Sequence, residues 1–150
     1  MTKFNTEQLG FSFLRKRKLT VDFGGGEITS DSGLLLVRQA DQSLGLLERL
    51  ANCITDRRDA RYTDHDLLIL IRQRIYQIVA GYEDCNDANC LRKDPALKAA
   101  CGSMPSDKEL GSQPTLSRLE NTVTQEDLYR MGSGLLIYIS VAIGNVSRSE

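Results

Sequence analysis

The sequence predicts a mainly α-helical protein with one short strand near its start, followed by about five helices. Three observations support this class. Apolar residues recur at three- and four-residue spacing in several segments, which is the period of a helix with one buried face. Residues that cap helices stand before several of these segments. The 150-residue chain has no Trp, four Phe and five Tyr, so its core rests on aliphatic side chains, which suits packed helices better than a β-sandwich.

The predicted strand is Lys18–Phe23, where apolar and polar residues alternate as in a half-buried strand. Before it, residues 1–17 form a basic lead without a clear period, which we expect to be poorly ordered. Three glycines at 24–26 end the strand. Such a loop can bind phosphate, but neither the Walker nor the dinucleotide spacing is present, and Glu27 would repel a phosphate. We therefore interpret this loop as a flexible turn.

Two helices are predicted next. Ser30 or Asp31 can cap a helix that runs to Gly45, which breaks it. A second apolar segment follows at 46–54. The polar and charged stretch 55–62 is typical of an exposed connection.

The most regular predicted helix follows this connection. Thr63 and Asp66 form a capping pattern, and Gly81 marks the end of the helix. Between the cap and the end, apolar residues recur at helical spacing and form one long stripe, which consists of Leu68, Ile71, Ile75, Ile78 and Tyr82.

Shorter helices are predicted in the second half of the chain. Two short helical pieces are expected at 88–92 and 95–100, and Asp94-Pro95 suits the start of the second one. A loop leads to another helix that begins at Pro114 and directs two leucines inward. A capping pattern at Thr124–Asp127 then precedes a further apolar segment.

The last apolar stretch is Leu135–Ile143, interrupted only by Ser140. It has roughly half of the ~20 residues that a membrane-spanning helix needs. We therefore expect a buried helix or strand there and no membrane contact. The start of the chain has no signal peptide, and we expect a cytoplasmic protein.

Several residue types that support catalysis or metal binding are present without a matching pattern. The four cysteines form no CxxC pair, so we interpret them as reduced, packed side chains, with a zinc site of four scattered thiolates as the lesser alternative. The single histidine, His65, stands between two aspartates that could raise its pKa, but a solvated residue at a helix start is the commoner case. Glu83, Asp84 and Asp87 could attract magnesium, but a solvated linker is the better interpretation.

DNA binding is indicated by the distribution of charge more than by its sum. The formal net charge is -1, from 19 basic and 20 acidic residues, which argues mildly against a dedicated nucleic-acid binder. Basic residues nevertheless gather toward the front, and hydrogen-bonding side chains stand early in the helix from Pro114. The candidate DNA-binding residues are Arg15, Lys16, Arg17, Lys18, Arg57, Arg58, Arg61, Arg72, Arg74, Gln113, Thr115, Ser117 and Arg118.

Four groups of residues stand in a characteristic order along the chain. They are the stretches Val21–Phe23 with Gly25–Asp31 and Gly33–Leu36, Arg72–Ile78, Gly81–Asp84 with Asn86–Ala88, and Ser112–Asn121. Taken in this order, they resemble the N-terminal region of group 1 DDE transposases from bacterial insertion sequences. No single group is specific, but the ordered set between Lys18 and Met131 is.

The resemblance implies a protein that cuts and joins the ends of a mobile DNA element. Members of the family carry an RNase H-like catalytic domain, in which three acidic side chains hold two divalent metal ions, Mg²⁺ in the full-length family. The helical N-terminal part is expected to help recognise the element ends or organise the assembly. The implied partners are DNA at the insertion-sequence ends and a full-length transposase.

The sequence departs from the family after Gly132. Residues 132–150 contain no Asp and only a terminal Glu, where the family continues into the strand with the first catalytic aspartate. We therefore expect a helical region at 18–131, a divergent apolar tail at 132–150, no completed RNase H-like sheet, no catalytic residue and no cofactor in this chain. The alternatives are a stand-alone DNA-binding or inhibitory module, and the inert product of a decayed gene.

Overall fold

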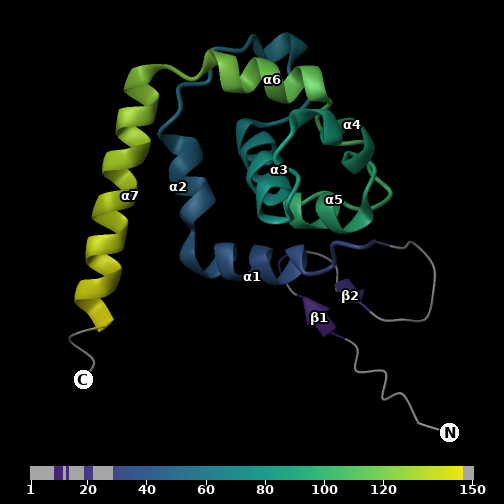
Figure 1. Cartoon of the computed structure of the whole chain (residues 1–150), viewed down its shortest axis with the longest axis horizontal. Helices are drawn as coiled ribbons and strands as arrows, with labels where there is room; N and C mark the ends of the chain where they lie inside the picture. The colour runs from purple at the N-terminus through teal and green to yellow at the C-terminus, as the bar shows by residue number, and fades with distance from the viewer. Residues whose placement is uncertain (1–8, 12, 14–18, 22–28, 147–150) are drawn as a thin grey trace, which may run out of the picture.

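The chain folds into a body of packed helices with a small two-stranded sheet at its edge (Figure 1). The computed structural model describes residues 9–11, 13, 19–21 and 29–146. Over these residues the mainly helical class predicted from the sequence is confirmed. The described elements are β1 (Leu9–Phe11), β2 (Leu19–Val21), α1 (Leu34–Leu44), α2 (Leu46–Asn52), the 3-10 turn η1 (Ala60–Tyr62), α3 (Leu67–Val79), the 3-10 turn η2 (Cys85–Asp87), α4 (Ala88–Leu91), α5 (Pro95–Cys101), α6 (Gln113–Thr122) and α7 (Gln125–Val146).

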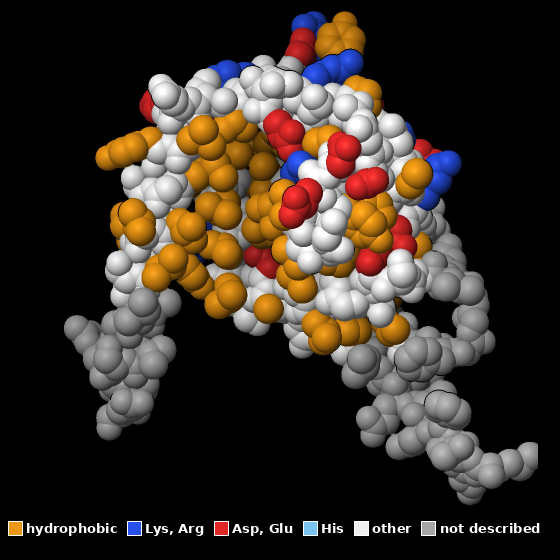
Figure 2. Space-filling view, in the orientation of Figure 1, with side chains coloured by type: hydrophobic (Ala, Val, Ile, Leu, Met, Phe, Trp, Pro, Cys, Tyr) orange, Lys and Arg blue, Asp and Glu red, His pale blue; other side chains and the backbone are white. Residues whose placement is uncertain are grey.

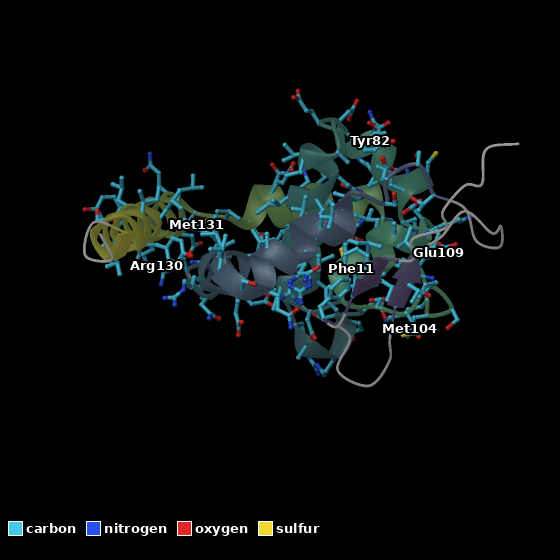
Figure 3. The ribbon with its side chains drawn as sticks, turned by 90° about the horizontal axis from the view of Figure 1, so that it is seen from below. Phe11, Tyr82, Met104, Glu109, Arg130 and Met131 are labelled. Atoms are coloured by element: carbon cyan, nitrogen blue, oxygen red, sulfur yellow. The ribbon has the colours of Figure 1, made fainter. Side chains whose placement is uncertain are left out.

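The sheet pairs the predicted strand with one that the sequence pattern does not indicate. β1 and β2 are antiparallel, with Leu9 opposite Val21 and Phe11 opposite Leu19. Phe11, labelled in Figure 3, and Phe13 are both buried, with ring centroids 5.9 Å apart. A three-residue strand is too short to show an alternating period, so its pairing and its two aromatic side chains define it instead. The glycine-rich turn at 24–26 and Glu27 lie outside the described residues.

The helices enclose two adjoining apolar clusters. In one cluster α1, α3 and α5 meet, and its buried residues include Leu34, Leu35, Tyr76, Leu97 and Ala100. The other cluster joins α2, α3 and α6 through Ile54, Leu70, Ile71, Leu116 and Leu119. Because α3 belongs to both clusters, it is covered on several sides. The two inward leucines predicted for α6 are confirmed.

Several helix ends follow the local signals in the sequence. Asp94 caps α5 by accepting from the Leu97 N–H at 2.8 Å, as predicted. Gly45 ends α1 with a left-handed φ of 65°, and Thr124 with Asp127 forms the predicted cap of α7. These signals are local in sequence, and therefore the sequence is sufficient to find them.

The caps predicted at Asp31 and at Thr63 are wrong. α1 begins after Gly33, and the Asp31 carboxylate instead accepts a hydrogen bond from the Tyr82 hydroxyl at 3.2 Å. The Thr63 hydroxyl donates to the Asp59 carbonyl within the η1 turn at 2.8 Å, and α3 starts later, after Asp66. In both cases the polar side chain forms a hydrogen bond elsewhere, either to a distant residue or within a turn, and does not cap the helix.

The buried face of α3 is rotated relative to the predicted stripe. Of the five stripe residues, only Ile71 is fully buried, and Ile78 is 47% exposed. The buried face includes Gln73 and Gln77. Because neighbouring helices surround α3, the buried face depends on where those helices lie as well as on the apolar pattern.

α7 joins the segment predicted after Thr124 and the apolar stretch Leu135–Ile143 into one continuous helix. It runs beside α2 at one side of the molecule (Figure 1). Arg130 and Met131 lie near its start (Figure 3), and Met131 packs against the cluster of α2, α3 and α6. The expectation that Leu135–Ile143 is buried is wrong for the residues whose exposure is described, since Leu136 and Ile137 are 68% and 66% exposed. Across the described residues, no helix has the length and apolar character needed to cross a membrane.

Candidate nucleic-acid interface

A groove of about 690 Å³ separates the connection at residues 57–65 from α6. Four of the predicted DNA-binding residues line it: Arg57 and Arg58 from the connection, and Thr115 and Arg118 from α6. These two segments are far apart in sequence, and packing of α6 against α3 brings them together. The structure therefore gathers part of the predicted set on one surface.

Arg57 is held beside the start of α7 by a buried carboxylate. Its Nη1 atom donates to Asp127 at 2.8 Å, while its side chain remains 43% exposed. Asp127 is fully buried and also accepts hydrogen bonds from the backbone of Thr55 and Thr124 and from the Arg130 side chain. The Arg57 guanidinium, together with hydrogen bonds from Thr124 and from the Thr55 backbone, holds the pKa of Asp127 well below its usual range. The carboxylate is therefore charged at neutral pH, and it fixes Arg57 at one wall of the groove.

Arg58 and Arg61 each donate hydrogen bonds to the aspartate that lies two residues earlier in the chain. Arg58 bonds to both carboxylate oxygens of Asp56 and to the His65 carbonyl, so all three of its guanidinium nitrogens are engaged. Arg61 bonds in the same way to Asp59 and remains 81% exposed. Arg58 thus braces the connection, whereas Arg61 keeps an open face toward solvent.

Arg118 differs from the other arginines of the groove. It lies on α6 and is exposed, and no described side chain or carbonyl bonds to its guanidinium. A guanidinium carries five N–H donors, all of which are then available to a ligand. Among the described residues of the predicted set, Arg118 is therefore the one with the greatest free capacity to bind an anion.

The polar residues at the start of α6 are engaged with one another and with α4. The Thr115 hydroxyl lies 3.0 Å from that of Ser112, and the Gln113 backbone N–H donates to the Asn89 side chain at 3.1 Å. Ser117 is half-buried on the same helix. Thr115 faces the groove, whereas Gln113 and Ser117 do not line it.

Arg72 and Arg74, which were predicted to contact DNA, belong to the interior of the fold. Their side chains are only 13% and 16% exposed. Burial and the nearby Arg38 lower the pKa of Arg72 below its ordinary value. Arg74 forms an ion pair with Glu120 and donates to the Glu83 carbonyl at 2.8 Å. The apolar pattern of α3 does not predict this burial, because the carboxylates that pair with the two arginines lie on segments that are distant in sequence.

Arg72 lies at the edge of a buried polar cluster that joins α1, α2 and α3. Asp41 accepts from Arg38 at 2.9 Å, from the Tyr76 hydroxyl at 3.2 Å and from the Leu47 N–H at 2.9 Å. Burial raises the pKa of Tyr76 above its ordinary value, with the Asp41 charge acting in the same direction. The Asp41 carboxylate gives a hydrogen-bond partner to a backbone N–H at the start of α2. Its hydrogen bonds hold α1, α2 and α3 together, so the role of this cluster is structural.

His65 and Tyr62 also line the groove, and neither was in the predicted DNA-binding set. Burial and the positive charge of Lys108 lower the pKa of His65, which is opposite to the effect that its acidic neighbours could have had. Tyr62 is 84% exposed and stacks against the Arg61 guanidinium at 5.8 Å. An aromatic residue beside arginines in a polar connection is a signal that sequence reasoning could have used.

The described residues do not form a site for the divalent metals of the family's reaction. No group of three or more potential ligands gathers among them. In the acidic stretch, Asp84 accepts from the backbone and side-chain amide of Asn86 and thereby caps η2. Asp84, Glu83 and Asp87 thus do not present a shared set of free oxygens, and we derive no step through a metal. The four cysteines are free thiols.

Arg15, Lys16, Arg17 and Lys18 lie outside the described residues. The basic run at 15–18 therefore stays a sequence prediction.

The stretches that suggested a family are bonded to one another in the fold. Gln73 pairs with Gly111 through both its amide atoms at 2.8 and 2.9 Å. Arg74 joins Glu120, and Tyr82 joins Asp31. The Arg74–Glu120 and Tyr82–Asp31 contacts each link two of the stretches, and Gln73 joins α3 to the residue that precedes the last stretch. The joint presence of the stretches therefore has a structural reason.

Residues 11–142 match the family described as transposase DDE domain group 1. The match covers most of the chain, and the chain belongs to this family of transposases. It begins in β1 and reaches into α7, and thus includes residues 132–142 beyond the stretches quoted from the sequence. The comparisons with curated proteins and with solved structures gave no match.

Proposed function

We propose that this chain is the DNA-contacting N-terminal region of a bacterial insertion-sequence transposase, and that it meets DNA at the groove between residues 57–65 and α6. The observation that carries the proposal is Arg118, an exposed and unengaged guanidinium on the wall of a groove that Arg57 also lines. The family supplies the substrate class, because transposases act on DNA.

The charges of the groove favour a modest, salt-sensitive interaction. Arg57 and Arg118 can approach phosphates, whereas Arg58 is already saturated by Asp56 and His65. Asp59 and Asp64 also line the groove and oppose a close approach at that end. We therefore expect only two or so phosphate contacts from this surface, with a correspondingly shallow salt dependence. The exposed ring of Tyr62 offers a stacking surface for a base.

Fluorescence anisotropy with a duplex from the element end and a scrambled duplex tests this proposal. Arg118→Ala should weaken binding to both duplexes and reduce the salt slope by about one. Titrations at about 50 and 200 mM salt give that slope. Arg49→Ala, which removes the same charge from exposed α2 outside the groove, is the matched control and should leave the slope unchanged. No binding at the lower salt, or equal effects of both variants, would overturn the proposal.

The proposal assigns no cleavage or strand transfer to residues 1–150 alone. We expect none of the acidic residues in the family stretches to be catalytic, and we propose that the chain acts in the cytoplasm as a binding fragment. Incubating the pure protein with element-end DNA and Mg²⁺ or Mn²⁺ should produce neither nicks nor joined ends. Metal-dependent nicking that persists in Arg118→Ala would show that chemistry resides in this chain.

A second candidate function is association with other copies of the transposase, including a full-length one that the fragment would inhibit. The observation that favours it is the exposed apolar surface of α7, where hydrophobic side chains gather beside the hollow next to α2 (Figure 2). Co-purification of the tagged fragment with a full-length transposase, lost on mutation of α7, tests this function separately from DNA binding.

A further inference from the structure

α7 is apolar around most of its circumference, and only one side of it is covered. From Gly132 to Val146 the sequence has no charged residue. α2 covers one side, where Arg49 lies 5.5 Å over the Tyr138 ring. Leu128, Leu136 and Ile137 are each more than half exposed. A helix that is hydrophobic on all sides is normally buried, so the uncovered side of α7 requires a partner.

One stripe of α7 has the spacing of a coiled-coil seam, and within it Leu135 also borders the hollow next to α2. Successive positions at intervals of four and three residues are apolar or small over three heptads. They are Leu128, Gly132, Leu135, Ile139, Ala142 and Val146. This 3.5-residue period keeps one stripe facing a partner helix along its length. Of the seam side chains whose exposure is described, Leu128 is 56%, Leu135 37% and Ile139 43% exposed.

We propose that the seam of α7 pairs with the seam of α7 in a second copy of this chain. In a coiled coil, charged residues at the positions that flank the seam select the partner helix. In α7 these positions include Tyr129, Met131, Leu136, Tyr138 and Ile143. Because these positions carry no charge, they neither repel an identical helix nor specify an oppositely charged one. This inference deepens the second candidate function and does not depend on DNA contact.

The exposed area fits a reversible dimer. Leu128, Tyr129, Leu135, Leu136 and Ile139 together expose on the order of 500 Å² of side-chain surface per copy, given about 200 Å² for each fully exposed large residue. Two copies would bury about 1,000 Å², which is at the lower limit for a specific interface. We therefore expect association in the micromolar range, with Gly132 allowing the two helices to approach closely.

Sedimentation velocity of the full chain, from low to several hundred micromolar, tests the proposal. The wild-type protein should show a monomer–dimer equilibrium. Leu135→Glu and Ile139→Glu should each weaken dimerisation by at least about tenfold, because the like charges would face each other across the seam. Ile137→Glu is the matched control, since it makes the same change on an exposed residue away from the seam, and it should leave the dimer intact.

Circular dichroism of each variant confirms that the helices are retained, and Ile139→Ala provides a milder seam variant that preserves helix propensity. A wild-type protein that stays monomeric throughout, or a dimer that the seam variants leave unchanged, overturns the proposal. A dimer disrupted equally by Ile137→Glu overturns it as well. Arg118→Ala should leave the dimer unchanged, so failure of the pairing is distinguishable from failure of the DNA proposal.

Discussion

Two glutamines on α3 allow a direct test of how polar groups act in this core. Gln73 and Gln77 lie one helical turn apart, and both are fully buried. Gln73 donates to the Gly111 carbonyl and accepts from the Gly111 N–H. Among the described residues, neither amide atom of Gln77 has a hydrogen-bond partner. Replacing each glutamine by Met, which has a similar shape, should therefore change the free energy of unfolding in opposite directions.

The magnitudes follow from the groups left behind. Gln73→Met leaves the N–H and the carbonyl of buried Gly111 without partners, and each such group costs about 1–3 kcal/mol. We expect a loss of about 2–6 kcal/mol, which is a large part of the roughly 5–15 kcal/mol that typically stabilises a domain. Gln77→Met removes polar atoms that are already unpaired, and should stabilise the fold by about 1–3 kcal/mol.

Urea unfolding followed by far-ultraviolet circular dichroism measures both changes as shifts of the midpoint at constant slope. Gly111→Ala is a control for the Gln73 contact. Its new Cβ would lie 2.7 Å from Cδ2 of Leu70 and 3.0 Å from Oε1 of Gln73, so it should also destabilise the fold. A loss of stability in both Met variants would refute the reasoning, since Gln77 would then make an interaction comparable to that of Gln73.

Two further predictions concern pH and the start of α7. The folded state lowers the pKa of His65 below its ordinary 6.5, so the unfolded chain binds the proton first as pH falls. Stability should therefore decrease below about pH 6.5, and His65→Gln should remove part of that decrease; identical pH profiles would contradict this. Thr124→Ala removes the hydroxyl that accepts from the Asp127 N–H and should cost about 1 kcal/mol. Thr124→Ser should restore most of the lowered thermal midpoint, and an unchanged midpoint in Thr124→Ala would show that the hydroxyl is dispensable.

Features that depend on neighbouring residues in sequence were predictable. The caps at Asp94 and Thr124, the break at Gly45 and the inward side of α6 all follow from short patterns, because a cap satisfies backbone groups within one turn. These patterns were sufficient to place α5, α6 and the start of α7 nearly at their observed bounds.

Features that depend on distant segments were not predictable. The burial of Arg72 and Arg74 requires Asp41 and Glu120, which lie on other helices. The burial of Gln73 requires the backbone of Gly111. A single sequence contains no signal for such pairs, and charged or amide side chains are normally assigned to the surface. The same reasoning correctly placed Arg57 and Arg118 on an accessible surface, although it could not show that they line one groove.

The buried carboxylate of Asp127 has a mechanical consequence. It ties Arg57, Thr55 and Arg130 together at the first turn of α7, and this turn anchors a helix of 22 residues. At 1.5 Å per residue α7 is a lever about 33 Å long, so a tilt of about 10° at the anchor would displace its far end by about 6 Å. A ligand that binds Arg57 and breaks its ion pair with Asp127 would loosen the attachment of α7 at its first turn. Occupancy of the groove could in this way be converted into movement at the opposite end of the helix.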